Sequence, residues 1–187
     1  FDWVQHGTRA MIDLWMYNYA RNIPDILDGN SVRLHSMFKN NSKSTKNHKP
    51  INSALVIGGG PSVYENKHLE TLANSNYKGA ILCTDRMLVP CLKNGITPKK
   101  FPQFFVLTMD PYQITIKFYN DKIVKKHNKG ISAIMSTFTI HETIEICKNY
   151  GLNIYWFNPI IDHFRKQGSI NKIMNMISKS DKNPDGF

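Results

Sequence analysis

Short apolar runs alternate with longer stretches of helical periodicity along most of the chain, and this alternation limits the folds open to it. Strands are predicted at Ala54–Ile57, Ala80–Thr84, Phe104–Thr108, Ile131–Ser136 and Asn153–Phe157. Helices are predicted between them, at Glu65–Ala73, Arg86–Lys93, Tyr112–His127 (with a break near Asn120–Asp121) and Ile140–Tyr150. Such a pattern is typical of a parallel sheet with helices on both faces. We therefore predict an α/β fold, a Rossmann-like three-layer sandwich with a mostly parallel sheet.

The ends of two predicted helices carry recognisable signals. Thr139 and Glu142 have the spacing of a capping box at the start of the helix Ile140–Tyr150. Gly151 follows this helix and Gly95 follows an earlier one, where a glycine in the left-handed conformation commonly ends a helix. We expect both helices to stop at these glycines.

The N-terminal part of the chain differs from the rest. Apolar residues recur at helical spacing over Trp3–Leu27, and Pro24 and Gly29–Asn30 then break the pattern. The following segment, Lys39–Pro50, has no apolar residue and is predicted to be a polar linker.

This helix and linker divide the chain into an N-terminal helical appendage, residues 1–50, and a second unit, residues 51–187. The helix carries an aromatic stripe made of Trp3, Trp15 and Tyr19. We expect the stripe to pack on the second unit; a contact within a homodimer is the alternative.

The composition fits a folded domain, since 41% of the residues are apolar. The sequence contains no run of about 18 apolar residues, so no membrane-spanning helix is predicted. The N-terminus lacks the basic and then apolar segments of a signal peptide. Cys83, Cys91 and Cys147 lie in separate apolar stretches and show no zinc-type spacing. Buried thiols in a reducing compartment are therefore expected, which favours the cytoplasm.

The formal net charge of +10 favours an anionic partner. The chain has no RNP-like aromatic motif, zinc finger or helix-turn-helix signature, so we do not expect specific nucleic-acid binding. In open α/β sheets, ligands bind beyond the carboxyl ends of the strands. The polar residues that follow each predicted strand are therefore the candidates for a site.

The first predicted strand runs directly into the sequence Gly58-Gly59-Gly60-Pro61-Ser62. Glycines allow the backbone to turn sharply and to approach a ligand closely, and the N-terminus of the following helix suits a phosphate group. The sequence is not a Walker A loop, and it does not complete the Rossmann fingerprint because Val63 stands at the third glycine position. We predict a phosphate-binding turn; a capping box made by Ser62 and Glu65 is the alternative.

Acidic residues follow the next two predicted strands. Asp85 has the position of an acid that bonds a ribose hydroxyl in nucleotide-binding folds, and Asp110 could hold Mg²⁺ beside a polyphosphate. Helix N-capping is the alternative for both. Asn158 ends the last predicted strand and could face the same ligand. The histidines His141 and His163 have no partner in the sequence pattern that indicates a catalytic triad or a metal site.

Three stretches, ALVIGGGPSV, ILCTDRMLVPCLKNGITPKKF and FFVLTMDP, resemble the archaeal 6-hydroxymethyl-7,8-dihydropterin pyrophosphokinase (MptE-like) family. The family pattern is a G-x-GPS loop, an Asp after the second strand, a G-I-x-P sequence and a strand closing on T-x-D. The resemblance covers roughly Asn52 to Pro159. Related sequences occur as motility-associated glycosyltransferases, and bacterial sialyltransferases carry a similar GPS loop.

The resemblance implies a Mg²⁺-dependent transfer of diphosphate from ATP to the hydroxymethyl group of a reduced pterin, in folate-type cofactor synthesis. The turn at Gly58, Gly60, Pro61 and Ser62 would hold the nucleotide phosphates. Asp85 would help to fix the nucleotide or the pterin, and Asp110 would coordinate Mg²⁺ or orient the hydroxyl.

The chain departs from the family pattern in one respect. The family usually has a second glycine-rich stretch after the segment that matches Gly168–Phe187, and this sequence ends at Phe187. We therefore expect the nucleotide-binding catalytic domain, residues 51–187, to be truncated at its C-terminal end. Two other functions remain as alternatives. One is a glycosyltransferase that uses a nucleotide sugar, and the other is a nucleotide-binding module without turnover.

Overall fold

The computed structural model describes residues 2–28, 32–33, 53–163 and 165–177, and of residues 2–10 and 32–33 only the backbone. The predicted linker Lys39–Pro50 and the helix-ending pair Gly29–Asn30 lie outside these residues, as does the side chain of Trp3.

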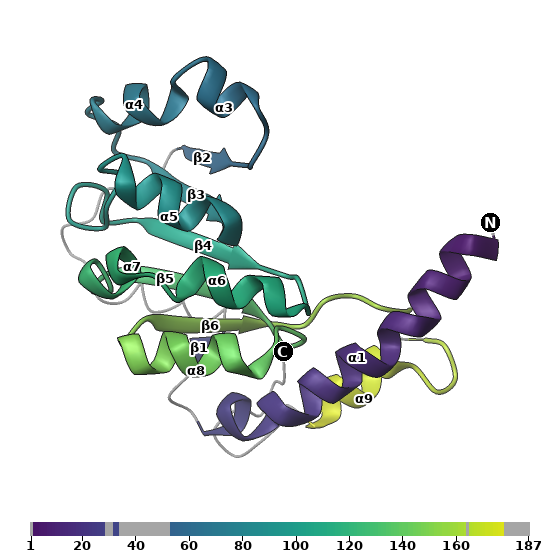
Figure 1. Ribbon diagram of the computed structural model, residues 1–187. Coiled ribbons are helices and arrows are strands. Elements are labelled where there is room, and N and C mark those ends of the chain that lie inside the picture. The colour runs from purple at the N-terminus through teal and green to yellow at the C-terminus, as the bar shows by residue number, and fades with distance from the viewer. Residues whose placement is uncertain (1, 29–31, 34–52, 164, 178–187) are drawn as a thin grey trace.

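The described residues form one six-stranded sheet in which every pair of neighbouring strands is parallel, in the order β1-β6-β5-β4-β3-β2 (Figure 1). The strands are β1 (Val32–Arg33), β2 (Ala54–Ile57), β3 (Ala80–Thr84), β4 (Phe104–Thr108), β5 (Ile131–Ser136) and β6 (Asn153–Phe157). The predicted α/β class is confirmed, and the predicted strands have the observed boundaries. The sequence analysis missed β1, which pairs with β6 at the edge of the sheet.

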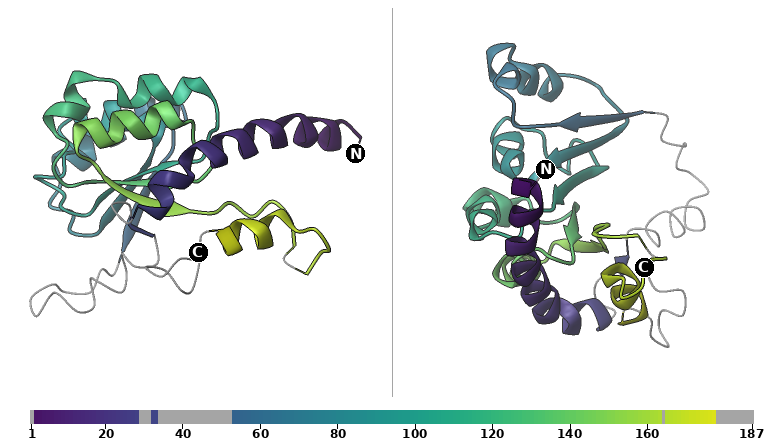
Figure 2. Two further views of the ribbon diagram at one scale, coloured as in Figure 1. Left: turned by 90° about the horizontal axis from the view of Figure 1, so that it is seen from below. Right: turned by 90° about the vertical axis from the view of Figure 1, so that its right-hand side faces the viewer.

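Each strand from β3 to β6 lies next to the strand that precedes it in the chain. Right-handed connections between such neighbours place the connecting helices on one face, and α5, α6 and α8 lie together there (Figure 2). The connecting elements are α3 (Ser62–Glu65), α4 (His68–Ala73), α5 (Asp85–Lys93), the 3₁₀ turn η1 (Gln113–Thr115), α6 (Ile116–Tyr119), α7 (Lys122–Lys126) and α8 (His141–Tyr150). Helix α9 (Ile170–Ile177) lies on the opposite side, near β6 (Figure 2).

The hydrophobic core lies between the sheet and this layer of helices. Its strand residues are almost fully buried and alternate along the sequence, as expected for one face of a pleated sheet. They include Ile81, Cys83, Phe104, Val106, Ile131, Ala133 and Met135. The thiols of Cys83, Cys91 and Cys147 are free and buried, as the sequence predicted.

Two predicted helical stretches are broken. The stretch Glu65–Ala73 is interrupted at Lys67, a non-glycine residue with φ of 50°, which separates α3 from α4. The stretch Tyr112–His127 breaks where expected, because α6 ends at Tyr119 and Asp121 caps α7 by accepting a 2.8 Å hydrogen bond from the N–H of Ile123.

The predicted capping box of α8 is wrong, although the predicted C-terminal glycines are confirmed. Ile140 is the N-cap, and the buried hydroxyl of Thr139 has no hydrogen-bond partner among the described residues. Glu142 instead pairs with Arg21 at 2.7 Å, so a tertiary contact replaces the local one. Gly95 and Gly151 adopt φ of 84° and 76°, the left-handed conformation expected at these helix ends.

The N-terminal helix α1 (Asp2–Leu27) continues through Pro24, where a break was expected. Its C-terminal half packs against the carboxyl end of the sheet, while its N-terminal end projects away from it (Figures 1 and 2). The ring of Trp15 stacks on Phe138 with centroids 5.6 Å apart, and Tyr19 meets the same ring edge-on. The predicted packing of the stripe is therefore confirmed for these two residues. No helix in the described ranges is long and apolar enough to cross a membrane.

Candidate functional site

Strands β2, β3 and β4 are neighbours, and their carboxyl ends meet at one edge of the sheet (Figure 1). Gly58 directly follows β2, Asp85 directly follows β3, and Asp110 lies two residues beyond the end of β4. Adjacent strands are about 4.8 Å apart. The fold therefore gathers the glycine turn and both acidic residues predicted from the sequence within one short stretch of this edge.

The glycine turn, Gly58 to Ser62, is exposed. None of its glycines adopts the left-handed φ that would require this residue type; the positive-φ glycines of the described chain are Gly95, Gly130, Gly151 and Gly168. A Cβ built on Gly58 meets no atom within 4 Å, and one built on Gly60 meets only the Ser62 hydroxyl at 4.0 Å. The protein's own packing does not explain these glycines, whereas close approach of a ligand would.

The sequence predicted that free N–H groups at the start of the following helix would bind the phosphate, and the structure differs in this respect. Helix α3 has only four residues, and the N–H groups of Val63, Tyr64 and Glu65 already donate to the carbonyls of Gly60 and Pro61 at 3.0–3.2 Å. Among the described hydrogen bonds, none uses the N–H groups of Gly59, Gly60 and Ser62. These N–H groups, rather than the helix, are the donors available to an anion.

The capping-box alternative for this turn does not hold, because the N-cap of α3 is Pro61 and Ser62 is the first helical residue. The Ser62 hydroxyl thus lies at the turn without the capping role.

Arg86 belongs to the site and was not predicted. A Cβ on Gly59 would lie 3.5 Å from its Cδ and 4.0 Å from its Nε, so the exposed arginine side chain passes directly over the glycine turn. A guanidinium in this position can bind phosphate oxygens with two parallel hydrogen bonds. The signal available in the sequence was its position in the first turn after β3, next to Asp85.

Asp85 and Asp110 lie close enough to interact electrostatically. Burial raises the pKa of the Asp85 carboxyl, and the negative charge of Asp110 raises it further, against hydrogen bonds from the Arg86 N–H and the Thr108 hydroxyl. The buried Thr108 hydroxyl also lies 2.7 Å from the hydroxyl of Tyr119. Two carboxylates that repel each other beside the glycine turn are a set of oxygen ligands that fits Mg²⁺.

Helix capping does not explain either acid. Thr84 is the N-cap of α5, and Asp85 is its first residue, accepting a 2.6 Å hydrogen bond from the N–H of Arg86. Asp110 accepts a 2.8 Å bond from the N–H of Tyr112, which is itself the N-cap of η1. Asp110 therefore shapes the loop after β4 through one oxygen, Oδ1.

Asn158 lies apart from these residues. It follows β6, which is four strands away from β2 and thus about 19 Å distant. Its Oδ1 accepts a 2.9 Å hydrogen bond from the Thr137 hydroxyl and so ties the loop after β5 to the end of β6. The structure does not bring Asn158 to the glycine turn, and its role in binding stays an untested prediction.

Helix α1 covers the loops that follow the strands on this side of the sheet, away from the glycine turn. The side-chain amide of Asn18 donates to the carbonyls of Pro111 and Phe138 at 3.0 and 2.9 Å, and that of Asn22 donates to Thr137 and Thr139 at 3.1 and 2.7 Å. Both asparagines are almost fully buried. The loops after β4 and β5 are therefore held by a helix from the N-terminal part of the chain.

Comparison with known proteins gives one finding. The model of one protein family, described as 6-hydroxymethylpterin diphosphokinase MptE-like, matches residues 17–184. No curated protein and no solved structure matches the chain. The matched range includes the glycine turn, Arg86, both acids and the C-terminal part of α1.

Proposed function

Because the chain belongs to the MptE-like family, we propose that it is a diphosphotransferase that moves a diphosphate group from ATP to a reduced hydroxymethylpterin. The hydroxyl oxygen of the pterin attacks the β-phosphorus of ATP, and the bond from this phosphorus to the α,β-bridging oxygen breaks. The products are AMP and the pterin diphosphate, and the hydroxyl proton is released.

The single observation that carries the proposal is the exposed glycine turn whose glycines no contact within the protein explains. The N–H groups of Gly59, Gly60 and Ser62 would donate to phosphate oxygens, and the Arg86 guanidinium would neutralise their charge. Phosphoryl transfer depends on positioning and charge neutralisation more than on covalent catalysis. These parts of the chain are suited to that task.

Asp85 and Asp110 would hold Mg²⁺, which supplies charge neutralisation between the phosphates when bound. The carboxylates would position the phosphates over the turn, and Asp110 could instead accept a hydrogen bond from the attacking hydroxyl. The raised pKa of Asp85 would fall once a cation lies beside it, because the cation favours the charged carboxylate.

The test is incubation of the full chain with Mg²⁺, ATP and 6-hydroxymethyl-7,8-dihydropterin. AMP and pterin diphosphate are expected in equal amounts. In a parallel incubation with a nucleotide sugar, release of a nucleoside mono- or diphosphate would support the glycosyltransferase instead, provided that no AMP forms from ATP. Tight nucleotide binding with neither reaction would support a binding module.

A further inference from the structure

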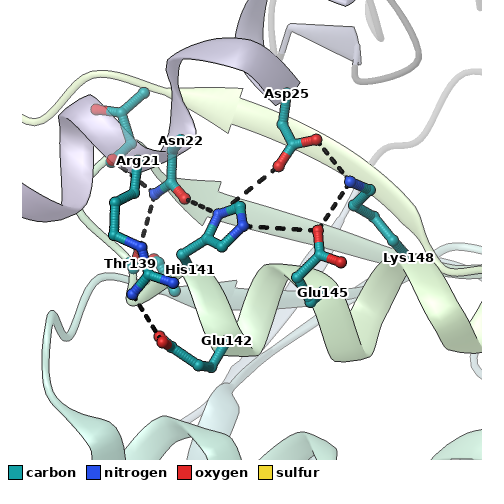
Figure 3. A network of polar contacts seen from close by, with 9 residues as sticks. Arg21, Asn22, Asp25, Thr139, His141, Glu142, Glu145 and Lys148 are labelled. Atoms are coloured by element: carbon teal, nitrogen blue, oxygen red, sulfur yellow. Dashed lines mark hydrogen bonds and ion pairs between the residues drawn. The ribbon is translucent and has the colours of Figure 1, made fainter.

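A second cluster of ionisable side chains lies between α1 and α8, away from the glycine turn (Figure 3). Asp25 comes from α1, while His141 and Glu145 stand four residues apart on α8 and so share one face of that helix. Each of the three residues offers one ligand atom, and these atoms lie within 4.8 Å of one another. The sequence pattern showed no partner for His141, because Asp25 is far away in the chain.

The hydrogen bonds of Asn22 determine which nitrogen of His141 is free. The Asn22 amide nitrogen donates to two backbone carbonyls, so its Oδ1 faces His141 Nδ1 at 3.0 Å. An amide oxygen only accepts, and Nδ1 must therefore carry the proton in the neutral ring. Nε2 then presents its lone pair to Oε1 of Glu145 at 3.7 Å.

Two acceptors that face each other leave room for a cation. Ligands of one tetrahedral Zn²⁺ ion lie about 3.4 Å apart, since each bond measures about 2.0–2.2 Å. The observed separation of Nε2 and Oε1 needs to shorten by only a few tenths of an ångström. A histidine that binds metal through one nitrogen commonly donates the other N–H to an oxygen, as His141 does toward Asn22.

Asp25 provides an independent observation. It is 9% exposed, and its Oδ2 accepts no hydrogen bond from the described residues while lying 3.8 Å from His141 Nδ1. A buried carboxylate oxygen without a hydrogen bond is costly, and a bound cation would remove that cost.

The cation now present is the ammonium group of Lys148. It lies 2.6 Å from Asp25 Oδ1 and 2.8 Å from Glu145 Oε1, and these contacts raise the pKa of Lys148 (Figure 3). Its side chain is 44% exposed and can turn into solvent. One ammonium leaves the two carboxylates with a net negative charge, whereas a divalent ion would neutralise them.

We propose that Asp25, His141 and Glu145 form a Zn²⁺ site that joins α1 to α8, with Lys148 as the cation that Zn²⁺ displaces. One nitrogen and two oxygen donors suit zinc better than magnesium. The bound ion would fix the helix that covers the loops after β4 and β5. The site is separate from the proposed Mg²⁺ site and does not depend on the proposed transferase activity.

The test is calorimetric titration of the full, chelator-treated chain with ZnCl₂ at pH 7.5. The wild type is expected to bind one Zn²⁺, and Glu145→Gln should weaken binding by more than about tenfold because it removes a ligand. Glu142→Gln is the matched control on the same helix, since Glu142 pairs with Arg21 outside the cluster. It should change the affinity by less than about twofold, as should Asp110→Asn at the other acidic site.

Lys148→Gln gives a result in the opposite direction. Removing the competing ammonium should tighten Zn²⁺ binding by at least about threefold, an effect that a misfolded variant would not produce. The proposal is overturned if the wild type shows no saturable Zn²⁺ binding up to millimolar concentration. It is equally overturned if Glu142→Gln weakens binding as much as Glu145→Gln, or if Lys148→Gln leaves the affinity unchanged.

Discussion

The loops at the carboxyl ends of the strands are built differently at the two ends of their row. At the end formed by β2 to β4, the glycine turn is exposed and two carboxylates repel each other. At the end formed by β5 and β6, Asn18 and Asn22 of α1 bind the carbonyls of the loop that follows β5, and Thr137 and Thr139 are fully buried. The first end keeps polar groups available for a ligand, while the second uses them to hold the fold together. Substitutions at the first should therefore affect binding and turnover, and substitutions at the second should affect stability.

The largest expected effect belongs to Asp110→Asn. If Asp110 holds Mg²⁺ or orients the attacking hydroxyl as proposed, loss of its carboxylate should lower kcat/KM for AMP formation by about 10²–10³-fold, equivalent to roughly 3–4 kcal/mol. Asp121→Asn is the matched control, because Asp121 makes the same 2.8 Å bond to the N–H two residues ahead but caps α7. The control should keep turnover within about twofold. Equal losses in the two variants would contradict a role of Asp110 at the site.

A smaller effect, on stability alone, is expected for Asn22→Ala at the covered end. The change leaves the carbonyls of Thr137 and Thr139 without their donor and should lower the free energy of unfolding by about 2–3 kcal/mol. Urea denaturation measures this loss. The exposed Asn76→Ala should stay within about 0.5 kcal/mol of the wild type. If Asn22→Ala instead abolished turnover in protein that is still folded, the division between the two ends would be wrong.

Arg86→Met should weaken nucleotide binding by about tenfold, or about 1.4 kcal/mol, because one charge-assisted contact to phosphate is lost. Lys93→Met removes the same charge from the other end of α5 and should change the affinity by less than about twofold. Isothermal titration with Mg·ATP measures both variants. Similar losses for the two would mean that Arg86 acts only through the net charge of the protein.

The smallest effect is the pH dependence of Asp85→Asn. The pKa of Asp85 is raised in the folded state, so its contribution to stability is present at low pH and is lost as pH rises through that pKa. Asp85→Asn should therefore match the wild type near pH 3 and be more stable at pH 7 without Mg²⁺, by less than about 1 kcal/mol since solvent screens a partly buried group. Melting temperatures at the two pH values provide the measurement. A variant less stable than wild type at pH 7 would contradict the raised pKa of Asp85, which burial and, to a smaller extent, the charge of Asp110 cause.

The local features of the fold were predictable from the sequence, and the features that depend on distant contacts were not. Strands such as Phe104–Thr108 were located because they are continuous apolar runs between polar turns. The start of α8 was misassigned because the Glu142 carboxylate, which the capping box required, pairs instead with Arg21, far away in the chain. Strand β1 has only two residues and leaves no periodic signal.

The candidate site shows the same division. The positions of the glycine turn, Asp85 and Asp110 follow from the rule that ligands bind beyond the carboxyl ends of parallel strands. Arg86 was missed because the sequence does not show that its side chain reaches from the end of β3 to the glycine turn after the neighbouring strand β2. The grouping of Asp25 with His141 depends on how α1 packs against α8, which no local pattern contains.

Amide chemical shifts recorded during titration with Mg²⁺ and a non-hydrolysable ATP analogue test the central claim most directly. We predict saturable shifts at Gly59, Gly60 and Ser62, whose N–H groups are the free donors of the turn, and little change at Asn18, Asn22 and Thr139 under α1. Shifts confined to the covered end, with the glycine turn unchanged at saturation, would contradict the account.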